Sequence, residues 1–192
     1  MEDIATEAGI TKVTLYTYFQ SKENLYLAVT FYALRDLVTE FRKTLKANGC
    51  KTGLESTLEL FKLFIEFCEK NYFYSELLLD YFSLVRSTVM SENHLKLTES
   101  MKESEYFEKL KKLHNLPFKL TASEIARGIS DGSIRNDLDP MYCTLQGWAM
   151  AIGYIKLISA SGEKANQLFN IDLQKLKDFN LELTKQILSK TD

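Results

Sequence analysis

Hydrophobic residues recur every three or four positions along most of this chain, which is the spacing of one face of an α-helix. The clearest stripe lies in residues 51–70, at Leu54, Leu58, Phe61, Ile65 and Cys68. Leu60, Phe64 and Phe67 add a second stripe to the same segment, so this helix is expected to lie centrally. Two prolines and eight glycines among 192 residues favour long helices. We therefore predict an all-α fold.

The same spacing predicts further helices at residues 21–46, 72–88, 103–115, 121–130, 141–159 and 172–189. The last one carries a coiled-coil-like seam, which Phe179 widens, at Leu173, Leu176, Asn180, Leu183 and Ile187. The helix before it is rich in small residues, which let another helix approach closely. We expect these two helices from each of two subunits to form a four-helix dimer interface.

Breaks between the helices carry their own signals. Pro117 disfavours helical geometry at the residue before it, so a kink or break is expected there. Residues 131–140 form the clearest loop, in which Gly132 ends one helix and Asp139 caps the next. The aspartates of this loop could also suggest a metal site, but capping explains Asp139 more simply. Further loops are expected at residues 91–100 and around Gly162.

The first nineteen residues predict two short helices joined by a tight turn. Gly9 follows the first helix, where a left-handed backbone is needed, and Ile10 is expected to return to the core. Thr11 is a good N-cap for the second helix, and Leu15 and Phe19 then face inward together. This pattern is typical of a helix-turn-helix, whose second helix enters the DNA major groove. It suits an ordinary helical hairpin equally well.

The particular residues favour the first interpretation. The stretches 3–5, 8–12, 14–19 and 21–25 closely resemble the DNA-binding signature of TetR-type (TetR/AcrR) transcriptional regulators, without a gap from Met1 to about Val29. The loop at residues 132–140 is similar to the pattern of that family as well. The resemblance implies a dimeric all-α regulator, usually a repressor, which a small molecule releases from its operator.

The resemblance also implies one more helix ahead of Met1, which would complete the core of the helix-turn-helix. We therefore expect an N-terminal segment to be missing from this sequence. The domain organisation expected is a helix-turn-helix domain with its connecting helix over residues 1–46, followed by a ligand-binding and dimerisation domain over residues 47–192.

The DNA contacts implied by the resemblance are hydroxyl, amine and aromatic side chains of the second helix and the start of the third. Val13 and Thr14 are expected to read bases, Lys12 either to read a base or to hold a phosphate, and Tyr16, Thr17, Tyr18 and Lys22 to hold the backbone. The expected partner is a near-palindromic double-stranded DNA operator. The predicted DNA-binding residues are Thr11, Lys12, Val13, Thr14, Tyr16, Thr17, Tyr18 and Lys22.

A small-molecule effector is the second implied partner. Twelve Phe, ten Tyr and one Trp leave room for an aromatic-lined pocket, although a filled core would use the same residues. Glu66 and Asp80 interrupt apolar helices and are candidate polar anchors for an apolar or aromatic ligand. The predicted ligand-binding residues are Phe64, Phe67, Tyr81, Tyr106 and Trp148.

Charge does not support DNA binding, so that prediction rests on the motif alone. The net charge of the chain is −2, and residues 1–22 carry two lysines and three acids, or 2 − 3 = −1. Cys50, Cys68 and Cys143 are too widely spaced for a disulfide framework or a zinc site, and reduced thiols in a cytosolic protein are expected. No apolar run has transmembrane length and no secretory signal is recognisable, so no membrane partner is expected.

No catalytic set is recognisable. His94 and His114 are the two histidines, and neither lies in a motif with a nucleophile. We expect a protein that is not an enzyme and uses no cofactor or metal. The alternatives that remain open are a helical ligand-binding or interaction protein without DNA-binding activity and, with less support, a helical enzyme.

Overall fold

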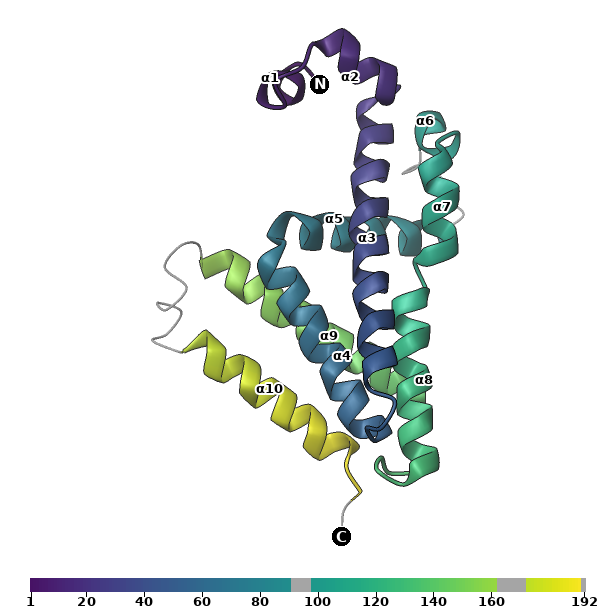
Figure 1. The fold of residues 1–192 in the computed structure, drawn as a ribbon, viewed down its shortest axis with the longest axis vertical. Helices are drawn as coiled ribbons and strands as arrows, with labels where there is room; N and C mark the ends of the chain where they lie inside the picture. The colour runs from purple at the N-terminus through teal and green to yellow at the C-terminus, as the bar shows by residue number, and fades with distance from the viewer. Residues whose placement is uncertain (91–97, 162–171, 191–192) are drawn as a thin grey trace. The chain divides into compact units, whose positions relative to one another are not determined.

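The computed structural model describes residues 1–90, 98–161 and 172–190, and within these ranges the chain forms ten helices (Figure 1). The described residues include no strand, only one isolated antiparallel bridge between Ile134 and Ser189. The predicted all-α fold is therefore confirmed. None of the helices in the described ranges combines the length and apolar character that a membrane span requires.

The chain divides into two compact units. The first comprises Met1–Asp36 and Phe73–His114, and the second comprises Leu37–Tyr72 and Asn115–Asp192. Helix α3 begins in the first unit and ends in the second. The functional division at residue 46 stays a prediction.

The first unit contains the N-terminal helices and the middle of the chain. Its helices are α1 (Glu2–Glu7), α2 (Lys12–Tyr18), the first part of α3 (Lys22–Ala47), nearly all of α5 (Tyr72–Met90), α6 (Glu99–Lys102) and α7 (Glu105–Leu113). Most of the loop predicted at residues 91–100 lies outside the described residues, as does the loop predicted around Gly162. Helix α6 begins inside the former range, after its N-cap Thr98.

The second unit is a packed group of four helices. These are α4 (Gly53–Lys70), α8 (Leu116–Asp131), α9 (Pro140–Ser161) and α10 (Leu173–Leu188). Helix α4 contacts the other three, and α10 packs on α4 and α9 (Figure 1). The predicted central position of α4 within this unit follows from its two apolar sides, since Phe61, Phe64 and Ile65 are all buried.

Helices α4 and α8 approach each other closely where two glycines meet. A Cβ atom built on Gly53 would lie 2.1 Å from the backbone nitrogen of Gly128, so no other residue fits at Gly53. The Asp131 carboxylate accepts a hydrogen bond from the Gly53 amide at 2.7 Å. The Ser133 hydroxyl accepts one from the Leu54 amide at 3.1 Å. The end of α8 therefore satisfies the free amides at the start of α4.

The predicted boundaries between α8 and α9 are confirmed, but the predicted start of α8 at residue 121 is wrong. The break lies at residues 114–115, and α8 begins at Leu116 with Pro117 in its first turn, where a proline needs no amide donor. Gly132 ends α8 with a φ of 79°, in the left-handed region that favours glycine. Asp139 caps α9 by accepting hydrogen bonds from the Met141 and Tyr142 amides, both at 2.9 Å.

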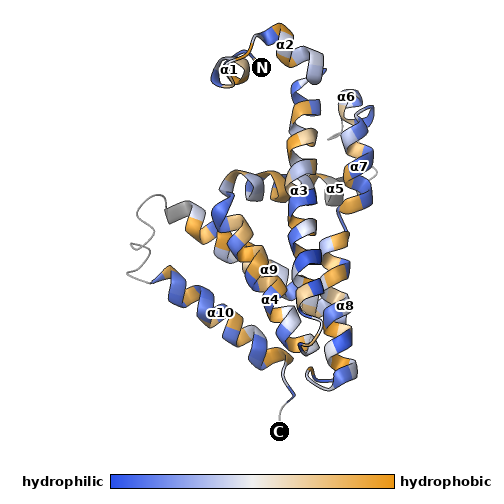
Figure 2. Cartoon of the chain, in the orientation of Figure 1, coloured by the Kyte–Doolittle hydropathy of each residue, from blue (hydrophilic) through white to orange (hydrophobic). Residues whose placement is uncertain are grey.

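Among the buried residues of helix α10, only Leu173 belongs to the predicted seam. Its buried residues are Leu173, Lys177, Thr184 and Leu188. The seam residues Leu183 and Ile187 are 37% and 45% exposed. The hydropathy-coloured ribbon of Figure 2 shows apolar and polar residues alternating along α10. The helix therefore has a packed inner face and an apolar outer face.

Candidate nucleic-acid interface

The turn between α1 and α2 has the backbone that the sequence predicts. Gly9 adopts a φ of 67°, and its amide donates to the Thr6 carbonyl at 3.1 Å. The Ile10 amide donates to the Ala5 carbonyl at 3.0 Å. These bonds close the end of α1 in the manner of a glycine-terminated helix. The turn that they stabilise leads directly to the start of α2.

Thr11 starts α2 as predicted, because its hydroxyl accepts a hydrogen bond from the Thr14 amide at 3.1 Å. Leu15 is 4% exposed and Ala5 is 2% exposed, so one residue from each helix forms the centre of this small head. Phe19 is half-buried at the C-cap. The predicted return of the chain to the core at Ile10 is wrong in this structure: Ile10 is 38% exposed, because two helices of six and seven residues cannot enclose it.

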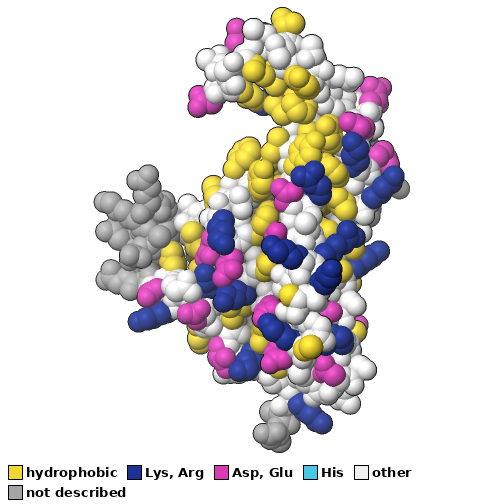
Figure 3. All heavy atoms as spheres, viewed as in Figure 1, with side chains coloured by type: hydrophobic (Ala, Val, Ile, Leu, Met, Phe, Trp, Pro, Cys, Tyr) yellow, Lys and Arg dark blue, Asp and Glu magenta, His cyan; other side chains and the backbone are white. Residues whose placement is uncertain are grey.

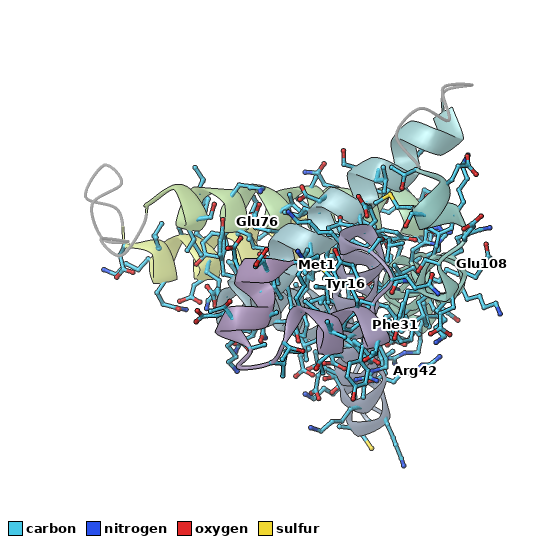
Figure 4. The ribbon with its side chains drawn as sticks, turned by 90° about the horizontal axis from the view of Figure 1, so that it is seen from above. Met1, Tyr16, Phe31, Arg42, Glu76 and Glu108 are labelled. Carbon is cyan, nitrogen blue, oxygen red and sulfur yellow. The ribbon has the colours of Figure 1, made fainter. Side chains whose placement is uncertain are left out.

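The predicted DNA-contacting residues lie together on the open side of α2 and at the start of α3. Val13 and Tyr18 are 75% and 72% exposed, and Tyr16, labelled in Figure 4, is also exposed. Thr14 is half-buried, and the remaining members Thr11, Lys12, Thr17 and Lys22 are exposed. Figure 3 shows hydrophobic side chains gathered on the surface of this head. Burial of Leu15 fixes which face of α2 is presented.

The polar side chains of this face form hydrogen bonds and an ion pair within the head. The Thr11 and Thr14 hydroxyls are 2.8 Å apart, and the Thr17 hydroxyl donates to the Thr14 carbonyl at 2.6 Å. Lys12 forms an ion pair with Glu2 at 3.3 Å, with both side chains largely exposed. An exposed pair of this kind contributes about 0–1 kcal/mol, so Lys12 can exchange Glu2 for a phosphate at little cost.

The first turn of α3 is tied to α6 and α7 within the same unit. The Asn24 amide donates to the Ser21 hydroxyl at 3.1 Å, which is the predicted cap. The Ser21 and Ser100 hydroxyls are 2.8 Å apart, and the Asn24 side chain donates to the Ser104 hydroxyl at 2.9 Å. Sequence analysis missed Ser100 and Ser104, because nothing local marks a partner 79 or 80 residues away.

The predicted ligand-binding residues fall into both units. In the second unit, the rings of Phe64 and Trp148 have centroids 4.0 Å apart, and Phe118 lies 4.3 Å from the same Trp148 ring. Phe67 is half-buried on α4. Sequence analysis missed Phe118, whose position beside Pro117 at the start of α8 gave no sign of this contact. Phe64 and Trp148 are 2% exposed, which suits a filled aromatic core as well as a pocket wall.

In the first unit, Tyr106 contacts Phe31 and Tyr32, with centroid distances of 6.0 and 6.2 Å. Tyr81 is fully buried, and within the described residues its hydroxyl has no hydrogen-bond partner. Burial, followed by the charges of Tyr26 and Glu108, raises the pKa of Tyr81. Phe31 and Glu108 are labelled in Figure 4. That the five predicted residues line one cavity stays a prediction.

The two predicted polar anchors, Glu66 and Asp80, hold fewer partners than Glu69, an acid that was not predicted. Glu66 lies 3.9 Å from Lys62 on its own helix, and Asp80 is exposed. Sequence analysis missed Glu69, which accepts hydrogen bonds from Lys177 at 3.0 Å and from the Tyr154 hydroxyl at 3.0 Å. Burial, followed by this hydrogen bond, raises the pKa of Tyr154. This polar cluster joins α4, α9 and α10.

No metal site stands out in the described ranges. No group of three or more His, Cys, Asp or Glu side chains there is placed to hold a metal ion. Asp137 and Asp139 are occupied, the first by an ion pair with Arg135 at 2.5 Å and the second by its capping role. The three cysteines are unpaired with one another, and burial raises the pKa of the Cys68 thiol to about 12.

Comparison with known proteins agrees with the geometry of the head. Residues 1–29 match the family model described as bacterial regulatory proteins, tetR family. The HTH-type transcriptional activator FasR of Mycolicibacterium smegmatis is 37% identical over 73 residues, which is 38% of this chain and 33% of that relative. The match thus spans one third of the relative's length. With its glycine turn, capped second helix and outward hydroxyl and aromatic face, the head of this chain is similar to that family over residues 1–29.

Proposed function

We propose that this protein is a DNA-binding transcriptional regulator that docks α2 in the major groove of a near-palindromic operator. The observation that carries the proposal is that Lys12, Val13, Tyr16, Thr17 and Tyr18 of α2 are exposed while Leu15 is buried. Val13 and Thr14 would read base edges, and Lys12, Tyr16, Thr17, Tyr18 and Lys22 would hold mainly the backbone.

A homodimer completes the proposed DNA-binding form. The outer faces of α9 and α10 expose large apolar side chains, among them Tyr142 at 77% and Phe179 at 62%. Two-fold pairing is the commonest assembly of soluble proteins. Two heads would then contact half-sites roughly 34–36 Å apart, one turn of the double helix. Leu183→Glu should convert the dimer to monomers in light scattering.

Release by a small apolar or aromatic molecule would make the protein a repressor. This part of the proposal rests on the buried aromatic residues of both units and on the family resemblance. The relative FasR is named as an activator. Whether the protein represses or activates is decided by measuring transcription in vitro, with and without the protein, from a promoter that carries the selected operator. Less transcript with the protein supports repression, and more transcript contradicts it.

The DNA-binding test is a salt-titrated affinity measurement on the full-length protein with an operator selected from random duplexes. Lys22→Ala should weaken binding to all sequences and reduce the slope of log affinity against log salt by about one, because one phosphate contact is lost. Lys46→Ala, an exposed lysine at the other end of α3, is the matched control. If both variants behave like the wild type, the proposed docking of α2 and α3 is wrong.

Thr14→Ala tests base reading separately from phosphate binding. The variant should change the base preferred at one position of each half-site, while the salt slope stays that of the wild type. Site selection from random duplexes measures the first quantity and salt titration the second. An unchanged consensus sequence would remove Thr14 from the base-reading set.

A further inference from the structure

The helix-turn-helix head is joined to α3 by a very short link. Helix α2 ends at Tyr18 and α3 begins at Lys22, so only residues 19–21 separate the two helices. A link of three residues spans at most about 11 Å, which leaves α2 little freedom once the first turn of α3 is held. The contacts that hold this turn therefore also set where Lys22 lies relative to the exposed face of α2.

Two hydrogen bonds from α6 and α7 hold the first turn of α3, and Figure 1 shows these helices beside it. The Ser21 and Ser100 hydroxyls are 2.8 Å apart, and the Asn24 side chain donates to the Ser104 hydroxyl at 2.9 Å. Ser104 is 4% exposed, so water competes little for its bond. These four residues, here called the clamp, include the one just before Lys22 and the one two positions after it.

Each bond of the clamp includes a hydroxyl that caps a helix. Ser21 caps α3 by accepting a hydrogen bond from the Asn24 amide at 3.1 Å. Ser104 caps α7 by accepting one from the Tyr106 amide at 3.3 Å. Because both caps are also bonded across the clamp, the starts of α3 and α7 are fixed relative to each other.

We propose that the clamp positions Lys22 for its phosphate contact, which makes Asn24, Ser100 and Ser104 positioning residues of the DNA interface. Ser100 and Ser104 lie outside the residues 1–29 that match the family model. The inference rests on the proposed DNA docking and names residues that set its affinity. A turn that is ordered before DNA arrives needs no further ordering when the complex forms, so more of the contact energy appears as affinity.

Helix α7 is anchored to α3 by other contacts as well. The Tyr106 ring lies against those of Phe31 and Tyr32, and the Lys109 ammonium lies 4.8 Å from the centre of the Tyr106 ring. Leu110 is fully buried. Loss of one clamp bond should therefore leave α7 in place and free only the first turn of α3.

The test is operator affinity across a salt titration, measured with the full-length protein. Asn24→Ala removes the bond to Ser104, keeps the backbone amide that Ser21 caps, and introduces a residue that favours helix. It should weaken binding about fivefold, as expected for one hydrogen bond. It should also lower the slope of log affinity against log salt by up to about one, although no charge is removed, because Lys22 no longer meets its phosphate.

A double-mutant cycle shows whether Asn24 acts through Lys22. In the Asn24→Ala background, Lys22→Ala should have little further effect on affinity or on the salt slope. Additive effects of the two substitutions would contradict the positioning role.

The other bond of the clamp is tested by Ser100→Ala, which should weaken binding about threefold. Ser83→Ala is the matched control, since Ser83 is an exposed serine on α5 of the same unit, and its affinity and salt slope should equal those of the wild type. Thermal unfolding followed by circular dichroism measures the stability of each variant.

The outcomes separate this inference from the proposed docking. If Lys22→Ala weakens binding while Asn24→Ala keeps the wild-type affinity and salt slope, the docking stands and the clamp inference is wrong. An Asn24→Ala variant that loses affinity together with thermal stability, at an unchanged salt slope, would show a structural role only and would also overturn the inference. If Lys22→Ala itself changes neither affinity nor slope, the proposed docking fails and the clamp inference fails with it.

Discussion

The helix-turn-helix head and the four-helix unit of α4, α8, α9 and α10 depend on contacts of very different range. In the head, the Thr11 cap reaches three residues along the chain, and the Lys12–Glu2 pair reaches ten. In the four-helix unit, the Gly53–Asp131 bond joins residues 78 apart, and the Glu69–Lys177 pair joins residues 108 apart. The head is thus built from local signals, whereas the four-helix unit is built from non-local ones.

This difference also separates the residues expected to matter for stability from those expected to matter for function. The head buries little besides Ala5 and Leu15, and it exposes the residues proposed to meet DNA. The four-helix unit buries aromatic rings, an ion pair and a glycine-to-glycine helix contact. Substitutions should therefore be costly to overall stability in the four-helix unit, and costly to DNA binding in the head.

The largest expected effect is at the Glu69–Lys177 pair. The Lys177 side chain is 8% exposed and that of Glu69 is 26% exposed. Glu69→Ala leaves the ammonium group of Lys177 buried without its carboxylate, and should lower the free energy of unfolding by about 3 kcal/mol in urea titration. Replacing both residues together, Glu69→Leu with Lys177→Met, should recover most of that loss, since two apolar side chains need no partner.

Lys175→Ala provides the control, because Lys175 is exposed on the same helix and should change the free energy of unfolding by less than about 0.5 kcal/mol. A single Glu69→Ala variant as stable as this control would show that the ion pair does not hold α10 in place.

Leu15→Ala should have the next largest effect. It removes most of the buried side chain that fixes the orientation of α2, and should cost about 2 kcal/mol in the head. Because the head is small, amide hydrogen exchange of residues 2–18 should rise while protection in α4 stays unchanged. Operator binding should fall in parallel. Exposed Val13→Ala should leave exchange in the head as in wild type; faster exchange in that variant would contradict the assigned faces of α2.

Asp131 should give a smaller effect that depends on pH. Hydrogen bonding to Ser133, and then to the Gly53 amide, holds the pKa of Asp131 below its usual value of 3.8. Since the pKa is lower in the folded state, the carboxylate stabilises the fold above pH 4. That contribution is lost as the pH falls through the folded pKa. Asp131→Asn should therefore destabilise the protein at pH 7, and the gap from wild type should close below pH 4.

Thermal unfolding followed by circular dichroism between pH 7 and pH 3 measures this gap. Asp178→Asn, at an exposed position on α10, is a suitable comparison that should show no such closing gap. A pH-independent difference between wild type and Asp131→Asn would mean that shape, not charge, links α8 to α4.

The smallest effect is expected at the Lys12–Glu2 pair. Its side chains are 52% and 78% exposed, so Glu2→Gln should change the free energy of unfolding by less than about 0.5 kcal/mol. The same variant should strengthen DNA binding slightly, because Lys12 loses a competing carboxylate. Affinity measured at low salt would show this. Weaker binding by Glu2→Gln would instead assign Glu2 a supporting role in the head.

The sequence alone determined most of the helices and the turn and cap of the head. Periodicity located the long helices, and residue types with one specific backbone role located the ends: Gly9 and Gly132 at positive φ, Thr11 and Asp139 as caps. The inward position of Leu15 followed from spacing too. These features were predictable because each depends on residues within one or two helical turns.

Tertiary structure decided which elements pair and which face each helix buries. Periodicity predicted an apolar stripe on α10 but not that Lys177 would be buried and Phe179 exposed, because the inward face is chosen by α4 and α9. It likewise gave no sign that Ser104 meets Asn24, or that Phe118 joins Phe64 at Trp148. An apolar stripe predicts only that its residues are buried. The residues that they contact lie in chain segments tens of residues away, which only folding brings together.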